Sequence, residues 1–389
     1  MDVTSRLDAI TIDDLRAAGG TKWATHPQAI GAWIAEMDFG VAEPITRALH
    51  ASVDTARFGY TPEALNAALA RAYSEFAARR YGVEIDPHMV RSLPDVLAGM
   101  AVIVDYYTRP GSAVIVPTPA YMPFLLLPDW WDREIVQVPM ARDGDRWVYD
   151  LDALAAAYDA HDAQLLVLCN PHNPIGRVLT REEMLAIADV VEAKGGLVFS
   201  DEIHAPLIYP GAHHVPYATL DERTAAHTIT ATSASKAFNL PGLKCAQIVF
   251  SNPAHREAWT RAGRWTEHGA SMPGIDANIA AYDHGEPWLA DTLAYLDRNR
   301  KALTRLVADR LPGVRYSEPE ATYLALLDFR ETGLGDDPAA ILREEGGVAL
   351  TSGPACGQAA RGFARLNFGT PLPILEEIVA RIAGVLARH

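Results

Sequence analysis

The sequence predicts an α/β protein in which helices cover both faces of a mainly parallel sheet. Short apolar runs typical of buried strands alternate with stretches of helical periodicity. Two polar residues, Asn173 and Asp201, come just after such apolar runs, as expected at the ligand-binding edge of an open α/β sheet. A length of 389 residues and a hydrophobic content of 49% allow a large domain and a smaller one.

The elements follow in chain order. Helical periodicity is clear from Ala64 to Tyr81 and from Arg181 to Ala193. The candidate strands are Ala113 to Val116, Leu165 to Leu168, Leu197 to Phe199, His227 to Thr230 and Ala246 to Phe250. A second unit begins near Trp288 with a charged helical stretch to Leu311, an apolar run from Tyr323 to Phe329, and a closing helix from Pro373 to Arg388.

Composition restricts the possible functions. A net charge of −15 and a pI near 5.3 argue against a surface that follows nucleic-acid phosphates and against a polybasic membrane patch. We see neither a basic-then-apolar signal segment nor an apolar stretch of membrane-spanning length, so we expect a cytoplasmic protein. The three cysteines are widely spaced and odd in number, which indicates reduced core residues with neither a disulfide nor a metal.

Lys236 is a candidate nucleophile. It is one of five lysines against 29 arginines, and it follows Ser233 and Ser235 in a short polar stretch. A lysine that forms an imine must be neutral part of the time, and neighbouring hydroxyls can hold a phosphate. The simpler alternative is a solvated lysine after a serine-rich turn.

Asn173 and Asp201 each have a simpler interpretation too. Asn-Pro pairs mark loops, and aspartate after a strand often caps a helix. Asn170 begins a similar Asn-Pro pair, but the segment from Asn173 to Gly176 fits a ligand-binding loop better, since it aligns with the motif of the family described next.

The order Asn173, Asp201, Lys236 resembles that of fold-type I enzymes of pyridoxal 5'-phosphate (PLP), the aspartate aminotransferase superfamily of class I/II. The resemblance is closest to the MalY/PatB-type cystathionine β-lyase or C–S lyase branch. The other matching stretches are Trp33 to Phe39, Phe58 to Pro62, Thr118 to Tyr121, Ser200 to His204 and Arg361 to Asn367. The resemblance implies a large PLP-binding domain (51–285) with a mainly parallel seven-stranded sheet. It also implies a small α/β domain (286–389) that packs with the N-terminal segment (1–50).

The same resemblance implies roles for single residues. Lys236 would hold the cofactor and move the substrate proton, Asp201 would pair with the pyridine nitrogen, and Tyr121 would stack on the ring. Asn173 would donate to the phenolic oxygen, and His204 lies near it either directly or behind another group. The expected phosphate ligands are Ser233, Ser235, Lys244 and the backbone N–H groups around Asp95, Val96 and Leu97. Tyr60 would reach the phosphate of a neighbouring subunit in a homodimer, and Arg365 would bind the substrate carboxylate while Arg361 stays solvated.

The resemblance therefore predicts a PLP-dependent C–S lyase. It would perform β-elimination on a cysteine S-conjugate or a cystathionine-like amino acid. Transamination is the first alternative, since it uses the same cofactor contacts. A second is decarboxylating oxidative deamination to an aldehyde, as in lincosamide-type antibiotic biosynthesis. A non-catalytic regulator of this fold is disfavoured, because the chain is acidic and carries no added DNA-binding domain before Trp33.

Overall fold

The computed structural model describes residues 2–389, and a seven-stranded sheet forms the centre of its larger part. In spatial order the strands are β2 (Val90–Leu93), β10 (Ala246–Phe250), β9 (Thr228–Thr232), β8 (Leu197–Asp201), β7 (Ala163–Cys169), β3 (Ala113–Thr118) and β4 (Ile135–Pro139). Neighbours from β9 to β4 are parallel, whereas β10 is antiparallel to both β9 and β2. The predicted mainly parallel seven-stranded sheet is confirmed.

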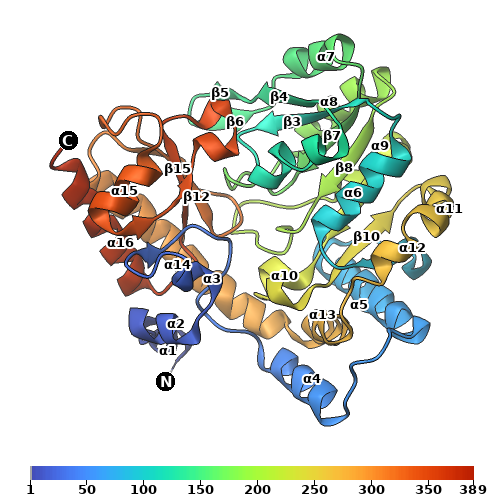
Figure 1. Cartoon of the computed structure of the whole chain (residues 1–389), viewed down its shortest axis with the longest axis horizontal. Coiled ribbons are helices and arrows are strands. Elements are labelled where there is room, and N and C mark those ends of the chain that lie inside the picture. The colour runs from blue at the N-terminus through green and yellow to red at the C-terminus, as the bar shows by residue number, and fades with distance from the viewer. Residues whose placement is uncertain (1) are drawn as a thin grey trace.

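Helices cover both faces of this sheet (Figure 1). Successive residues of β7 face opposite layers: Leu165 and Val167 pack with α6 (Val96–Tyr107), whereas Leu166 and Leu168 pack with α7 and α8. Burial on both faces explains why the strands read as continuous apolar runs. The other helices of this part are α4 (Glu43–Asp54), α5 (Glu63–Tyr81), α7 (Leu151–Ala160), α8 (Arg181–Ala193), α9 (Glu222–His227), α10 (Ala234–Ala237), α11 (Pro253–Ala262), α12 (Arg264–Glu267) and α13 (Met272–His284).

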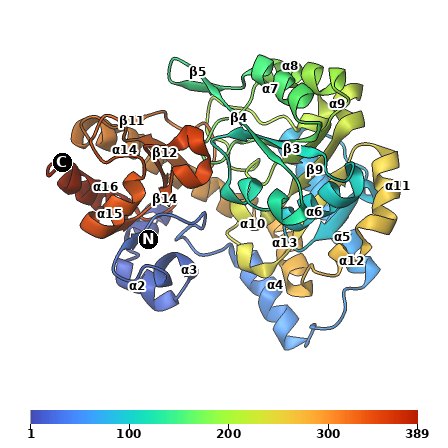
Figure 2. The ribbon, with the colours of Figure 1, turned by 45° about the horizontal axis from the view of Figure 1, so that its top comes forward.

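The C-terminal part forms a smaller unit beside the sheet (Figures 1 and 2). Its antiparallel sheet has the order β11 (Arg315–Tyr316), β12 (Leu324–Asp328), β15 (Phe363–Asn367), β14 (Thr351–Ser352). Its helices are α14 (Glu286–Arg310), α15 (Pro338–Gly346) and α16 (Leu372–Leu386). The N-terminal helices α1 (Val3–Asp8), α2 (Ile12–Ala18) and α3 (Thr21–Ala24) lie against this unit, and β1 (Ile30–Gly31) pairs in parallel with β13 (Val348–Ala349). A hairpin of β5 (Ala141–Asp143) and β6 (Arg146–Val148) completes the set.

The element boundaries differ from the expected ones in a few places. His227, expected in a strand, ends α9, so that β9 begins at Thr228. The helix α4 runs across residue 50, where we expected the N-terminal segment to end, and the Ser52 hydroxyl donates to Asp276 of α13 at 2.8 Å. The division into domains stays a prediction. The three cysteines are buried, as expected of core residues, and their thiols are free. Within residues 2–389, no helix has both the length and the apolar character needed to span a bilayer.

Candidate active site

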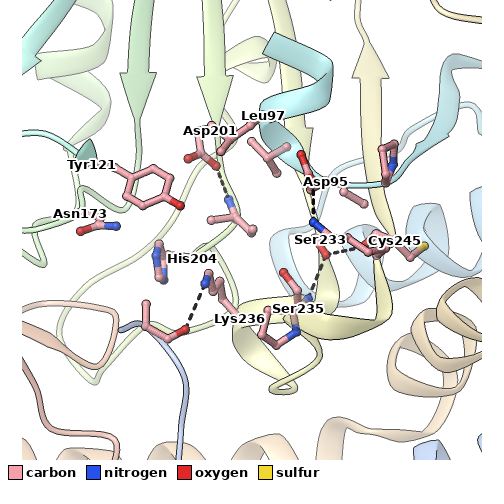
Figure 3. A pocket seen from close by; sticks show the side chains of 17 residues that line it. Asp95, Leu97, Tyr121, Asn173, Asp201, His204, Ser233, Ser235, Lys236 and Cys245 are labelled. Carbon is pink, nitrogen blue, oxygen red and sulfur yellow. Dashed lines mark hydrogen bonds and ion pairs between the residues drawn. The ribbon is translucent and has the colours of Figure 1, made fainter. Parts of the chain in front are cut away.

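A cavity of about 200 Å³ lies at the carboxyl ends of the parallel strands. Asp201 is the last residue of β8, Asn173 follows β7, Tyr121 follows β3 and Ser233 follows β9. Side chains predicted from separate stretches of sequence therefore line one space, together with Lys236 and His204 (Figure 3). The roles of these residues stay predictions, whereas their convergence is a property of the structure.

Asp201 is a buried carboxylate, and no cationic side chain of residues 2–389 forms an ion pair with it. Its Oδ1 accepts the backbone N–H of Ile203 at 3.1 Å, and the Cys169 thiol lies 3.9 Å from Oδ2. Burial raises the pKa of Asp201 to about 7, because the charged form is desolvated. A protonated ring nitrogen in the cavity would give this carboxylate the partner that it lacks.

Lys236 lies on the short helix α10 and points into the same cavity. Its Nζ donates to the backbone oxygen of Ala35 at 3.0 Å. Burial, and then the positive charge of Arg365, lowers the pKa of Lys236 to about 8. A substantial fraction of the amine is therefore neutral near physiological pH, as a nucleophile or base requires.

Arg365 is buried behind Asn173. Its Nη1 donates to Asn173 Oδ1 at 3.0 Å, and its Nη2 donates to the Trp33 oxygen at 2.7 Å and to Thr351 Oγ1 at 3.0 Å. Because Oδ1 faces the arginine, the amide nitrogen of Asn173 is turned away from it and can donate elsewhere. Arg365 is only 2% exposed and is not among the residues that line the cavity, a position that sequence did not predict.

His204 and Tyr121 form two further parts of the wall. Burial lowers the pKa of His204 to about 3, so the imidazole is neutral, and its Nδ1 has no partner within residues 2–389. Burial raises the pKa of Tyr121, which keeps its hydroxyl protonated. The structure places His204 in the cavity wall, the position that a direct cofactor contact requires.

The expected phosphate ligands gather at one end of the cavity. Ser235 lines it, and the Ser233 hydroxyl accepts the Ser235 N–H at 3.0 Å while donating to the Cys245 oxygen at 2.7 Å. Helix α6 begins at Val96, and the Asp95 carboxylate caps it by accepting the Ala98 N–H at 2.9 Å. This leaves the N–H groups of Val96 and Leu97 for an anion.

Lys244 differs from the other phosphate candidates. It is exposed and pairs with Asp95 at 3.1 Å, so its positive charge offsets a carboxylate that would repel a phosphate. The phosphate contact expected of Lys244 stays a prediction.

The donor set fits PLP. One end of the cavity offers hydroxyl and backbone N–H groups that can bind a phosphate. At the other end lies the buried Asp201 carboxylate, and a cationic partner would stabilise its charged form, which burial disfavours. Between them lie the Tyr121 ring and the Lys236 amine. The Nε of Arg365 and the Nδ1 of His204 are buried without a partner in the described chain, which leaves polar capacity for a bound molecule.

Some predicted residues lie outside the cavity. Tyr60 is 96% exposed and lies beside the segment 268–273 in a separate surface hollow. Arg361 is exposed and pairs with Asp336 at 2.8 Å, as expected for a solvated charge. Asn170 is buried and accepts the Leu179 N–H, which agrees with the choice of Asn173 over Asn170 as the cavity residue.

Sequence reasoning missed the part of the site formed by residues 33–37. The Ala35 oxygen accepts from both Lys236 and the Tyr323 hydroxyl, the latter at 2.9 Å. A contact made by a backbone carbonyl cannot be predicted from the side chain at that position. The stretch from Trp33 to Phe39 indicated only the family resemblance. Thr351 and Tyr323 likewise carried no signal.

Comparisons with known proteins agree with this geometry. The chain matches the model of the family described as aminotransferase class I and II over residues 34–382. It is 39% identical to the cystathionine beta-lyase of Corynebacterium glutamicum, with 96% of this chain and 99% of the relative covered. It is 32% identical to cystathionine beta-lyase PatB of Bacillus subtilis, with 92% and 93% covered. The crystal structure of the PLP-bound C-S lyase from Staphylococcus hominis matches with a TM-score of 0.90 at 26% identity, over 98% of this chain and 99% of that one.

Proposed function

Because the chain belongs to the aminotransferase class I and II family, we propose that it is a PLP-dependent carbon–sulfur lyase. The substrate is a cysteine S-conjugate or a cystathionine-like amino acid. The names of the relatives from C. glutamicum and B. subtilis, and the PLP-bound C-S lyase from S. hominis, support this reaction. The observation that carries the proposal is the presence of Lys236 and Asp201 in one cavity. Arg365 lies directly behind Asn173, a residue of the cavity wall.

Each of the predicted site residues has a separate role in this reaction. Bound PLP supplies an electron-accepting ring that makes the substrate Cα–H bond acidic. Lys236 would anchor the cofactor, and its neutral amine would accept the Cα proton. Asp201 would hold the protonated ring nitrogen by accepting its hydrogen bond. Arg365 binds the α-carboxylate and orients Cα toward Lys236.

The overall reaction balances with one water. The Cα–H and Cβ–S bonds break, and sulfur leaves with the bonding electrons and takes up a proton to give the thiol. The Cα proton goes to Lys236 Nζ, which lies in the cavity wall. The remaining three-carbon enamine is hydrolysed to pyruvate and ammonia.

Transamination is the second candidate, favoured by the family's own description. It would use the same residues, with Lys236 moving the proton, and it would release a keto acid that retains the sulfur while the amino group stays behind. Decarboxylating oxidative deamination would instead consume oxygen and yield an aldehyde, and a place in antibiotic biosynthesis would follow only from that outcome.

One assay separates these reactions. The purified protein is incubated with a cysteine S-conjugate with and without oxygen, and thiol, pyruvate, aldehyde, oxygen consumption and the cofactor spectrum are followed. Equal amounts of thiol and pyruvate without oxygen uptake support the lyase. A keto acid that retains sulfur would replace the lyase with an aminotransferase, and aldehyde with oxygen loss would replace it with the decarboxylating reaction.

The proposal includes a cytoplasmic homodimer. Tyr60, Phe58 and Trp265 are 96%, 63% and 84% exposed, and such large apolar surfaces favour contact with a second copy. A Tyr60 that reaches the partner's phosphate would make each site depend on both chains. Three free thiols in the core support a reducing compartment.

A further inference from the structure

Thr351 lies next to Arg365 in the small sheet. The two residues are direct partners across β14 and β15, so their side chains project from the same face. Both are buried, with exposed fractions of 6% and 2%. The threonine hydroxyl therefore meets the guanidinium away from water.

The direction of each hydrogen bond at Thr351 is fixed by chemistry. The Trp33 carbonyl can only accept, so the single hydroxyl hydrogen of Thr351 goes to it, at 2.7 Å. Arg365 can only donate, so its Nη2 uses a lone pair of the same hydroxyl, at 3.0 Å. Since Nη2 also donates to the Trp33 carbonyl, the three groups close a ring of hydrogen bonds.

This ring fixes the guanidinium with neutral acceptors only. Asn173 holds the other terminal nitrogen, and no carboxylate of residues 2–389 forms an ion pair with Arg365. A carboxylate partner would hold the arginine as firmly but would also cancel its charge. Neutral acceptors leave the positive charge of Arg365 available for a substrate carboxylate. Its Nε–H also has no hydrogen-bond partner within residues 2–389.

We propose that Thr351 is a positioning residue, which aims the Arg365 guanidinium at the α-carboxylate of the substrate. This inference rests on the proposed function only in needing an amino-acid substrate whose carboxylate binds Arg365. Thr351 itself does not line the cavity, so it acts through Arg365.

The test uses Thr351→Val, which keeps the shape and removes the hydroxyl, and Thr351→Ser, which restores it. The PLP-loaded proteins are titrated, by their cofactor spectrum, with L-alanine and with ethylamine, which lacks the carboxylate. We expect Thr351→Val to weaken L-alanine binding about tenfold, to change ethylamine binding less than twofold, and Thr351→Ser to recover most of the loss. Ser352→Ala, on the next residue of the same strand, is the matched control.

A double-mutant cycle with Arg365→Lys covers the case in which Thr351→Val folds poorly. If Thr351 acts through Arg365, the Thr351→Ser and Thr351→Val proteins bind L-alanine equally in the Arg365→Lys background. Equal weakening of both ligands by Thr351→Val, or an undiminished effect in that background, would show a merely structural role and overturn the proposal. The titration needs no turnover, so a wild-type protein that binds L-alanine through its carboxylate but releases no thiol would contradict the lyase reaction alone.

Discussion

The two walls of the cavity are built in different ways. The cofactor wall comprises Asp201, Asn173, Ser233, Ser235 and the start of α6, and these residues come at strand ends or at the beginning of a helix. What we call the substrate wall comprises Ala35, which lines the cavity, and the residues that support it from behind, namely the rest of 33–37, Tyr323, Thr351 and Arg365. Hydrogen bonds between segments about 200 or more residues apart hold it together. The topology of one sheet fixes the first wall, whereas the second depends on how the N-terminal segment docks onto the small unit.

Loss of Lys236, which joins both walls, has the largest expected effect. Lys236→Ala should lower turnover at least about 10³-fold, because it removes both the anchoring amine and the base. Steady-state release of thiol and pyruvate measures this effect. Lys301→Ala, at an exposed lysine paired with Asp297, is the control and should keep full activity. Turnover at the normal rate by Lys236→Ala would rule out the mechanism.

Arg365→Lys changes the substrate wall and removes the hydrogen bond from the guanidinium to Asn173. We expect kcat/KM to fall about 100-fold, mainly through KM, because an ammonium cannot grip a carboxylate with two parallel hydrogen bonds. The affinity for PLP should stay within a factor of two or so, as equilibrium dialysis of the cofactor would measure. Arg361→Lys, four residues earlier, should change neither quantity. A large loss of PLP affinity in Arg365→Lys would mean that the two walls are not independent.

Asp201→Asn tests the cofactor wall without its cofactor. The pKa of Asp201 is raised to about 7, so folded apoprotein binds this proton more tightly than the unfolded chain does. Its contribution to stability is therefore lost as pH rises from about 4 to 7. Apoprotein carrying Asp201→Asn should be more stable than the wild type by about 4 kcal/mol above pH 7 and equally stable below pH 4. Urea unfolding at several pH values measures this difference, and a constant difference would contradict the assignment.

Lys244→Met should have the smallest effect. Its exposed ammonium pairs with Asp95, and exposed ion pairs contribute little. We expect PLP affinity to fall by no more than about tenfold, and by less at high salt, where exposed charges are screened. Fluorescence titration of apoprotein with PLP at two salt concentrations tests this. A 100-fold loss of PLP affinity would contradict this expectation and would show that cofactor binding depends strongly on the Lys244 ammonium.

The contrast between the walls also explains what the sequence could predict. Asn173, Asp201 and Ser233 follow strands with clear apolar patterns, so their convergence could be expected from the rule for open α/β sheets. The roles of Ala35 and Trp33 rest on backbone oxygens, which have no sequence signature. The burial of Arg365 behind Asn173 depends on how β15 packs against the loop after β7. No local sequence pattern predicts such a contact between segments that lie far apart in the chain.

The docking of residues 33–37 is itself secured by a buried ion pair. Lys22 Nζ contacts Asp38 at 2.7 Å, and the Trp23 indole donates to the same carboxylate. Removal of one member of such a pair leaves an uncompensated charge and costs about 3–5 kcal/mol.

The Ala35 oxygen gives this segment a further significance. It accepts from the Lys236 amine in this structure, so the contact joins the N-terminal segment to the residue expected to hold the cofactor. If the lysine leaves this contact when it binds the cofactor, hydrogen exchange at the backbone of residues 33–37 should change on cofactor binding. For the same reason, trimming the N-terminus would damage catalysis even though no side chain of α1 to α3 lines the cavity.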